Sequence, residues 1–332
     1  MKNFYTKYEL EFIDSIYDEI RDLKRERNAV ILAHNYMTPD IYDIGDFKGD
    51  SLQLAREAAN VDAEVIVQAG VYFMAETSKI LAPNKTVLIP DTEAGCSLAS
   101  SITGADVKLI REKYPNYPIV TYVNSSADVK AESDICCTSS NAVAIVEHIA
   151  KEWNTDTVIV IPDKYLAQNI ANMTNLRIIT WNGRCIVHEE FTAKDVEELR
   201  YSFPGIIILA HPECPPEVLE KVDFAGSTSY LSQFVKDTQP DKVVLLTECS
   251  MSDNVSSENP NVEFIRPCNL CPFMKKITLI GVRDSLLHMR NVVEVEESVR
   301  LRAKESIDKM LSIDVKADAY KTGLKPKLIE FV

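Results

Sequence analysis

The chain has 332 residues, of which 46% are hydrophobic and 26% charged, and its formal net charge is −14 at pH 7. This length exceeds the usual size of a single hydrophobic core and predicts two or three compact units. A strongly acidic chain without a cluster of Lys and Arg among aromatic residues repels a phosphate backbone. We therefore expect no nucleic acid partner.

The first 28 residues alternate acidic and basic side chains at helical spacing, which predicts a helix. They contain neither the apolar segment nor the cleavage site of a secretory signal. The longest apolar runs, such as residues 206–210, are far shorter than the roughly 20 residues that span a bilayer. The expectation is a soluble, cytoplasmic protein with no membrane partner, whose eight cysteines are reduced.

Three strand-like runs follow in chain order, residues 30–36, 118–124 and 206–213, and each ends in polar residues. Aligned at His34, Tyr122 and His211, each run has an acidic residue 12 positions on and a hydroxyl residue 17 positions on. An amphipathic run comes after each hydroxyl, which predicts a helix with that hydroxyl as its N-cap. The acidic residues are Asp46, Asp134 and Asp223, and the hydroxyl residues are Ser51, Ser139 and Thr228.

Each repeat continues with two more apolar strands and closes at a cysteine. The closing cysteines are Cys96, Cys185 and Cys271, which lie 62, 63 and 60 positions after the aligned residue. Strands that alternate with helices at this pitch predict parallel βαβ layers. The sequence therefore predicts an α/β fold of three pseudo-threefold-related αβα sandwich domains, with parallel sheets around a central active site.

The expected domains follow the repeats. Residues 1–103 hold the N-terminal helix and the first sandwich, residues 104–191 the second and residues 192–280 the third. Residues 281–332 are expected to form a C-terminal helix and a polar tail that pack on the other units.

Polar residues at the strand ends predict a binding pocket, since ligands of open parallel sheets bind beyond the carboxyl ends of the strands. Alternation places residues i and i+2 on one face of a strand. Helix N-termini aimed at the same point favour anions, so the pocket suits carboxylates or a phosphate. The paired residues are His34 with Tyr36, Tyr122 with Asn124, and His211 with Glu213.

The three closing cysteines predict a metal centre. Three thiolates without a fourth protein ligand are typical of a [4Fe-4S] cluster with one open iron, whereas a structural zinc takes four ligands. An open iron is a Lewis acid that eases the loss of a substrate oxygen as water. The pattern at Cys96, Cys185 and Cys271 therefore predicts a dehydration.

The remaining cysteines and histidines lack this symmetry. Cys268 lies three residues before Cys271, a spacing also found in zinc sites and redox dithiols, so we expect it beside the cluster, with a disulfide to Cys271 after cluster loss as an alternative. For His188, three residues after Cys185, a site role and a structural role both stay open. We interpret the others as structural: Cys136, Cys137, Cys214, Cys249, His148 and His288.

Several motifs resemble the quinolinate synthase family, over about residues 10 to 311. They include LAHNY, GVYFMAETSKIL, YVNSSADVKAESDICCTSSNA, WNGRCIVHE, HPEC and CPFMKKITL. The resemblance implies a triangular three-domain fold, with Cys96, Cys185 and Cys271 as cluster ligands. It also implies a reaction of NAD biosynthesis, in which iminoaspartate from an aspartate-oxidising enzyme condenses with dihydroxyacetone phosphate to quinolinate, releasing phosphate and water.

The resemblance further implies roles for the pocket residues. Glu213 and His211 would form an acid/base pair, and Tyr36 and Tyr122 would assist enolisation and ring closure. The residues expected to hold or surround the substrates are His34, Ser51, Met74, Asn124, Ser139, Ser227 and Thr228.

Two alternative functions stay open on the residues alone. The enzymes of diphthamide synthesis and the reductase that makes isoprenoid diphosphates share a three-unit, three-cysteine plan, but their motifs differ, and they need S-adenosylmethionine or an electron donor. A cluster-based anion sensor is the non-enzymatic alternative. Glu213 argues against it, because a passive anion binder gains nothing from a carboxylate. For the tail after about residue 311, which extends past the usual end of the family, we predict no function.

Overall fold

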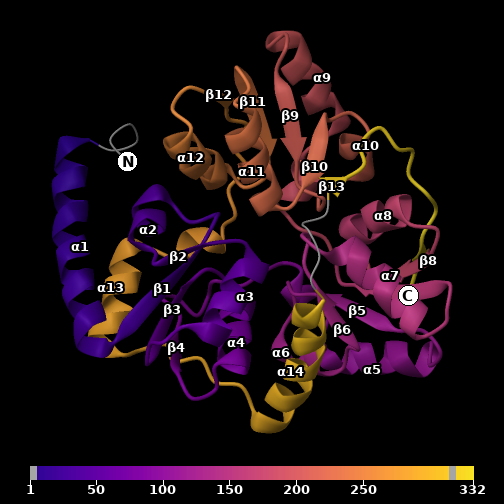
Figure 1. Cartoon of the computed structure of the whole chain (residues 1–332), viewed down its shortest axis with the longest axis horizontal. Coiled ribbons are helices and arrows are strands. Elements are labelled where there is room, and N and C mark those ends of the chain that lie inside the picture. The colour runs from indigo at the N-terminus through magenta and orange to yellow at the C-terminus, as the bar shows by residue number, and fades with distance from the viewer. Residues whose placement is uncertain (1–5, 314–318) are drawn as a thin grey trace. The chain divides into compact units, whose positions relative to one another are not determined.

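The computed structural model describes residues 6–313 and 319–332 (Figure 1). Residues 1–5 of the predicted first domain and residues 314–318 within the predicted last domain lie outside the described residues. The chain forms two compact units, one of residues up to 96 with 270–296 and one of residues 97–269 with 297–332. Each unit is described by itself below.

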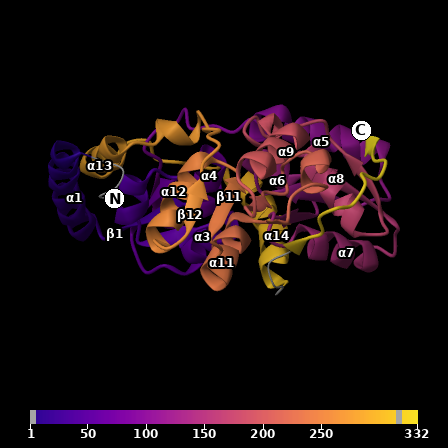
Figure 2. The same cartoon turned by 90° about the horizontal axis from the view of Figure 1, so that it is seen from above.

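The first unit contains one four-stranded parallel sheet in the order β2-β1-β3-β4. Its helix α1 (Lys7–Arg27) begins with a capping box between Thr6 and Glu9, and α13 (Leu279–His288) packs on it (Figure 1 and Figure 2). The other elements are β1 (Ala29–His34), α2 (Pro39–Ile44), β2 (Phe47–Gly49), α3 (Ser51–Asn60), β3 (Val65–Ala69), α4 (Tyr72–Leu81) and β4 (Thr86–Leu88).

The second unit contains two sheets, and the first of them has the strand order β6-β5-β7-β8. Helix α14 (Glu297–Ser312) packs on α6 and β6 of this half. The elements are α5 (Gly104–Lys113), β5 (Ile119–Tyr122), α6 (Ala127–Ala131), β6 (Ile135–Cys137), α7 (Ala142–Glu152), β7 (Thr157–Ile161), α8 (Lys164–Met173) and β8 (Arg177–Thr180).

The other sheet of the second unit has the strand order β10-β9-β11-β12. Its elements are α9 (Ala193–Ser202), β9 (Ile207–Ala210), α10 (Pro216–Leu219), β10 (Phe224–Gly226), α11 (Thr228–Thr238), β11 (Lys242–Leu246), α12 (Cys249–Glu258) and β12 (Glu263–Ile265). All three sheets therefore share one order of strands, with the lead strand of each repeat second from the edge. The α/β fold with three parallel sheets is confirmed, whereas the domain boundaries and the pseudo-threefold axis stay predictions.

The acidic residue of each repeat has the same structural task. Its backbone N–H donates to a carbonyl of the lead strand, and its carboxylate accepts a hydrogen bond of 2.7–2.8 Å from the N–H of the same strand residue. A basic residue of the preceding helix pairs with each carboxylate. The 12-residue spacing therefore marks a structural contact between the acidic residue and the lead strand, here called a strand-to-loop lock. It does not mark a site residue. The locks are Asp46 with Ile31 and Lys24, Asp134 with Ile119 and Arg111, and Asp223 with Ile208 and Arg200.

The C-terminal tail adds one strand to each sheet of the second unit. Strand β13 (Ala319–Tyr320) pairs antiparallel with β10, and β14 (Glu330–Phe331) pairs parallel with β8. Between them the backbone N–H of Lys327 donates to Asn172 at 2.8 Å. The tail, yellow in Figure 1, therefore covers two sheet edges that would otherwise expose unpaired backbone groups.

We expect Tyr320→Ala to lower the free energy of unfolding by about 2–4 kcal/mol, because a large buried side chain is removed. Tyr320 is 4% exposed where β13 meets β10. Leu328→Ala is the matched control, since Leu328 is a fully exposed residue of the same tail, and its replacement should change the unfolding free energy by less than about 0.5 kcal/mol. Chemical denaturation measures both. Equal effects of the two substitutions would contradict docking of the tail.

No helix within residues 6–313 and 319–332 is both long and apolar enough to cross a bilayer.

Candidate active site

A buried carboxylate, Glu213, organises a polar cluster in the second unit. It follows β9, and Tyr122 ends β5, so both lie beyond the carboxyl ends of lead strands. The hydroxyl of Tyr122 donates to Glu213 Oε1 at 2.5 Å, and Asn124 Nδ2 lies 3.4 Å from the same oxygen. Tyr122 and Asn124 of the second repeat therefore contact the carboxylate of Glu213 of the third repeat, and the sequence predicted all three residues.

His188 holds the other oxygen of Glu213. Its Nδ1 lies 2.9 Å from Glu213 Oε2 and 3.2 Å from Cys185 Sγ, and its Nε2 lies 2.9 Å from Thr247 Oγ1. Its ring also stacks on that of His211, with centroids 4.6 Å apart. His188 is 1% exposed and contacts both Glu213 and Cys185, which favours the site role among the two that the sequence left open.

Thr247 was not predicted from the sequence. It contacts His188 from the carboxyl end of β11. The sequence signal that could have indicated Thr247 is its position directly after a buried apolar strand, at the edge of the sheet where the other site residues lie. The polar cluster thus contains Tyr122, Asn124, Cys185, His188, His211, Glu213 and Thr247.

Burial and charge set the protonation state of Glu213. Burial alone would raise the pKa of this carboxyl, which is 3% exposed, but the charges of His188 and His211 and hydrogen bonds from His188 and Tyr122 outweigh it and lower the pKa to about 2. A second buried carboxyl, Asp163, behaves in the opposite way. Burial and then the charge of Glu213 raise the pKa of Asp163 well above its usual value. The surroundings of these two carboxyls therefore shift their pKa values in opposite directions, a separation typical of acid/base sites.

Histidine at the end of a lead strand binds its own loop in both units. In the first unit His34 Nδ1 accepts from the backbone N–H of Tyr36 at 3.2 Å, and in the second unit His211 Nδ1 accepts from that of Glu213 at 3.3 Å. Two of the three i and i+2 pairs predicted from the sequence thus share a local geometry. His34 is buried, and its ring contacts Tyr36 edge-on.

Met74 is a further predicted residue of the first unit, buried on α4. Gly70 lies against it, since a Cβ on Gly70 would come within 2.9 Å of Met74 Sδ. Ser51 is the first residue of α3 in the same unit. The first unit therefore contains His34, Tyr36, Ser51 and Met74, and the second unit contains the other predicted pocket residues.

The predicted N-caps are wrong for all three helices. The N-cap residues are Asp50, Asn141 and Ser227, and the carboxylate of Asp50 and the hydroxyl of Ser227 accept from backbone N–H groups at 2.9 and 3.3 Å. Asp and Asn cap as well as Ser or Thr, so the run of polar residues left the capping position ambiguous. The hydroxyl residues remain near the helix starts: Ser51 and Thr228 are the first helical residues, and Ser139 precedes Asn141 by two.

The closing cysteines occupy equivalent local positions. Each is half-buried, lies in the loop after the fourth strand of its repeat and comes three residues before a short 3-10 turn. Each also comes seven residues before a Thr that caps the next helix; these residues are Thr103, Thr192 and Thr278. In the first unit the two cysteine loops are neighbours, since a Cβ on Gly95 would lie 3.6 Å from Phe273.

The donor atoms of the second unit suit a metal. One ligand atom each from Cys185, His188 and Glu213 lies within 4.8 Å of the other two. Thiolate, imidazole and carboxylate are all ligands of iron and zinc. The described cysteines and this group are therefore compatible with a metal cofactor.

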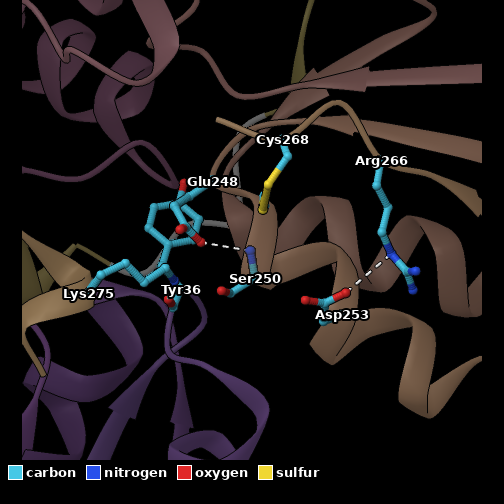
Figure 3. The surroundings of a disulfide bond; sticks show 8 residues. Tyr36, Glu248, Ser250, Asp253, Arg266, Cys268 and Lys275 are labelled. Atoms are coloured by element: carbon cyan, nitrogen blue, oxygen red, sulfur yellow. Dashed lines mark hydrogen bonds and ion pairs between the residues drawn. A yellow bond between two sulfur atoms is a disulfide. The ribbon is translucent and has the colours of Figure 1, made fainter. Parts of the chain in front are cut away.

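The expectation that all eight cysteines are reduced is wrong, because Cys268 forms a disulfide with Cys249 (Figure 3). Cys271, the alternative partner, does not take part in this disulfide. A backbone bridge between Glu248 and Asn269 aligns the two segments and leaves the Cα atoms of the cysteines 5.0 Å apart, within bonding range. Glu248 accepts from the N–H of Ser250 at 2.8 Å and Arg266 pairs with Asp253, as Figure 3 shows. The sequence spacing of Cys268 and Cys271 did not reveal this partner.

We expect peptide mapping of air-oxidised, denatured protein to recover Cys249 and Cys268 in one cross-linked peptide pair, because their Cα atoms already lie at disulfide distance. Cys268→Ser should abolish this pair. Cys137→Ser, which replaces a buried cysteine outside the disulfide, should leave it intact. Recovery of a peptide that links Cys268 to Cys271 instead would contradict the assignment.

Comparison with known proteins shows the family of the chain. Residues 18–312 match the model of the family described as quinolinate synthetase A protein. A quinolinate synthase of Caulobacter vibrioides is 59% identical over 296 residues, which are 89% of this chain and 81% of that protein. Quinolinate synthase 1 of Mesorhizobium japonicum is 59% identical over 303 residues, or 91% and 92% of the two chains. A quinolinate synthase of Xylella fastidiosa is 56% identical over 301 residues, or 90% and 88%.

Matches of this extent separate the chain from the other three-unit, three-cysteine enzymes, and the chain belongs to the quinolinate synthetase A family.

Proposed function

We propose that the chain is a quinolinate synthase, an enzyme of NAD biosynthesis that condenses iminoaspartate with dihydroxyacetone phosphate to quinolinate and releases phosphate and water. The observation that carries the proposal is the buried Glu213 cluster in a chain of this family. A pathway that oxidises aspartate must supply the iminoaspartate. The proposed location is the cytoplasm.

We further propose that Cys96, Cys185 and Cys271 together hold one [4Fe-4S] cluster. Their similar spacing, their half-buried loops and the short 3-10 turn and capped helix after each of them support a common task. Thiolates are the usual ligands of such clusters. When bound, the cluster supplies an open iron that polarises a substrate oxygen and eases its loss as water.

Glu213 is proposed as the general base. Its low pKa keeps it ionised at neutral pH, so both oxygens are hydrogen-bond acceptors. A substrate C–H next to a carbonyl is a proton source of the kind that such a buried carboxylate accepts during enolisation. Tyr122, whose hydroxyl donates to Oε1, is proposed to orient the carboxylate and so to assist enolisation and ring closure.

His211 is proposed as the acid of the pair. In its protonated, imidazolium form His211 gives a proton to a leaving hydroxyl, so that the hydroxyl departs as water and the ring becomes neutral. Tyr36 is proposed to assist ring closure.

The remaining predicted residues are proposed to bind the substrates. The N-terminal ends of α3, α7 and α11 carry Ser51, Ser139, Ser227 and Thr228, where backbone N–H groups and the helix dipole favour carboxylate and phosphate oxygens. Asn124 is proposed to bind the same oxygens, and His34 and Met74 to line the pocket.

Anaerobic purification followed by an assay tests the function. We expect brown protein with about four irons per chain, which forms quinolinate from the two substrates without S-adenosylmethionine or an added electron donor. Colourless, iron-free protein would contradict the cluster. Brown protein that binds both substrates without turnover would instead support an anion sensor.

A further inference from the structure

One side chain outside the polar cluster holds the loop that carries Glu213. The amide nitrogen of Asn169, on α8, donates to the carbonyl oxygens of Pro212 at 2.8 Å and of Cys214 at 3.1 Å. These carbonyls flank Glu213 on both sides. Asn169 is 2% exposed, so the two hydrogen bonds are shielded from water.

The loop depends on these bonds because it has no regular structure of its own. Residues 211–215 lie between β9 and α10, and Pro212 has no N–H to donate. The N–H of Glu213 donates to Nδ1 of His211 at 3.3 Å, and the N–H of Cys214 donates to the carbonyl of His211 at 3.0 Å. Both hydrogen bonds therefore stay within the loop. Asn169 is the side chain that joins its carbonyls to a regular element.

Helix α8 is a rigid support for Asn169. Its N-cap Asp163 accepts from the N–H groups of Tyr165 and Leu166 at 2.8 and 3.0 Å, and the apolar residues Leu166 and Ile170 are buried. A buried, well-capped helix restrains a side chain far more than a loop does.

The same helix is tied to the loop that leads to Cys185 and His188. Asp163 forms a backbone bridge with Gly183, and the N–H of Lys164 donates to the Gly183 carbonyl at 2.9 Å. This approach requires glycine, because a Cβ on Gly183 would lie 2.5 Å from the carbonyl oxygen of Pro162. Helix α8 thus fixes both loops whose side chains, His188 and Glu213, meet at 2.9 Å.

We propose that Asn169 is a positioning residue of the active site, which clamps the Pro212–Cys214 loop so that Glu213 keeps its contacts with Tyr122 and His188. This inference rests on the proposed function of Glu213. Asn169 itself contacts the loop backbone and acts through Glu213. Small shifts of a general base have large effects on the chemical step, whereas substrate binding depends on many other contacts.

Asn169→Leu tests the clamp, because leucine has a similar volume and donates no hydrogen bond. We expect kcat for quinolinate formation by the anaerobic holoenzyme to fall at least tenfold, with both KM values changed less than about threefold. Hydrogen exchange of the peptide that contains residues 211–214 should accelerate at least tenfold without substrate.

Asn259→Leu is the matched control. Asn259 is also buried in the second unit, and its amide donates to the Val255 carbonyl at 2.8 Å, away from the site. The control should lose similar thermal stability but keep kcat and the exchange rate of residues 211–214. If Asn169→Leu does not fold, Asn169→Ser, which is smaller and polar, replaces it with the same expectations.

Two outcomes would overturn the inference. One is a kcat for the Asn169 variant equal to that of the control, and the other is unchanged exchange of residues 211–214. The exchange measurement needs no turnover, so it decides on the clamp even if the proposed function fails. That failure would be recognised separately, by the absence of quinolinate formation in the unaltered protein.

Discussion

Glu213→Gln should lower kcat for quinolinate formation by about 10²–10⁴-fold, the range typical for loss of a general acid or base. Glutamine keeps the shape of the side chain and accepts a hydrogen bond from Tyr122, but it cannot take a proton from the substrate. The measurement is steady-state turnover of anaerobically purified protein, with the iron content of each sample determined in parallel.

Asp223→Asn is the control for this prediction. Asp223 belongs to the same sheet and its carboxylate also binds a backbone N–H, that of Ile208, but it locks a strand and lies outside the polar cluster. We expect reduced thermal stability and a kcat within about twofold of the unaltered protein. Full turnover of Glu213→Gln with an intact cluster would remove Glu213 from the mechanism.

Most of the fold was predictable because each repeat needs the same residue types at the same positions for local structural reasons. A carboxylate at a fixed distance after each lead strand locks the strand end, so Asp46, Asp134 and Asp223 keep their spacing. Apolar runs buried on both faces mark the parallel strands, as in β3 and β7. Three such signals in one order define three sheets of one topology.

The site was predictable where it follows the strand phase and not where it follows tertiary contacts. Tyr122 and Glu213 lie at strand ends, so the prediction included both. Thr247 and Asn169 are ordinary polar residues in sequence, and their importance comes from partners 59 and 43 residues away. The same limit explains the disulfide: the backbone bridge that aligns Cys249 with Cys268 is a long-range pairing without a local signal.

Serine in place of any one of Cys96, Cys185 and Cys271 should remove most of the iron, bleach the brown colour and lower turnover at least 100-fold. A cluster held by three thiolates retains two after such a change, and a serine hydroxyl is a much weaker ligand for iron at neutral pH. Iron analysis and visible absorption of anaerobic samples measure the loss without reference to activity.

Cys249→Ser and Cys268→Ser are the controls that make this prediction sharp. Both replace cysteines of the second unit that do not close a repeat, and Cys268 is only three residues from Cys271. Each should keep its iron and its turnover, because the disulfide joins α12 to the segment after β12 and contributes no cluster ligand. Loss of iron from Cys268→Ser, with iron retained in Cys271→Ser, would move the third ligand from one cysteine to the other. Retention of iron in all three repeat variants would overturn the proposed centre, since the matched spacing would then reflect the fold alone.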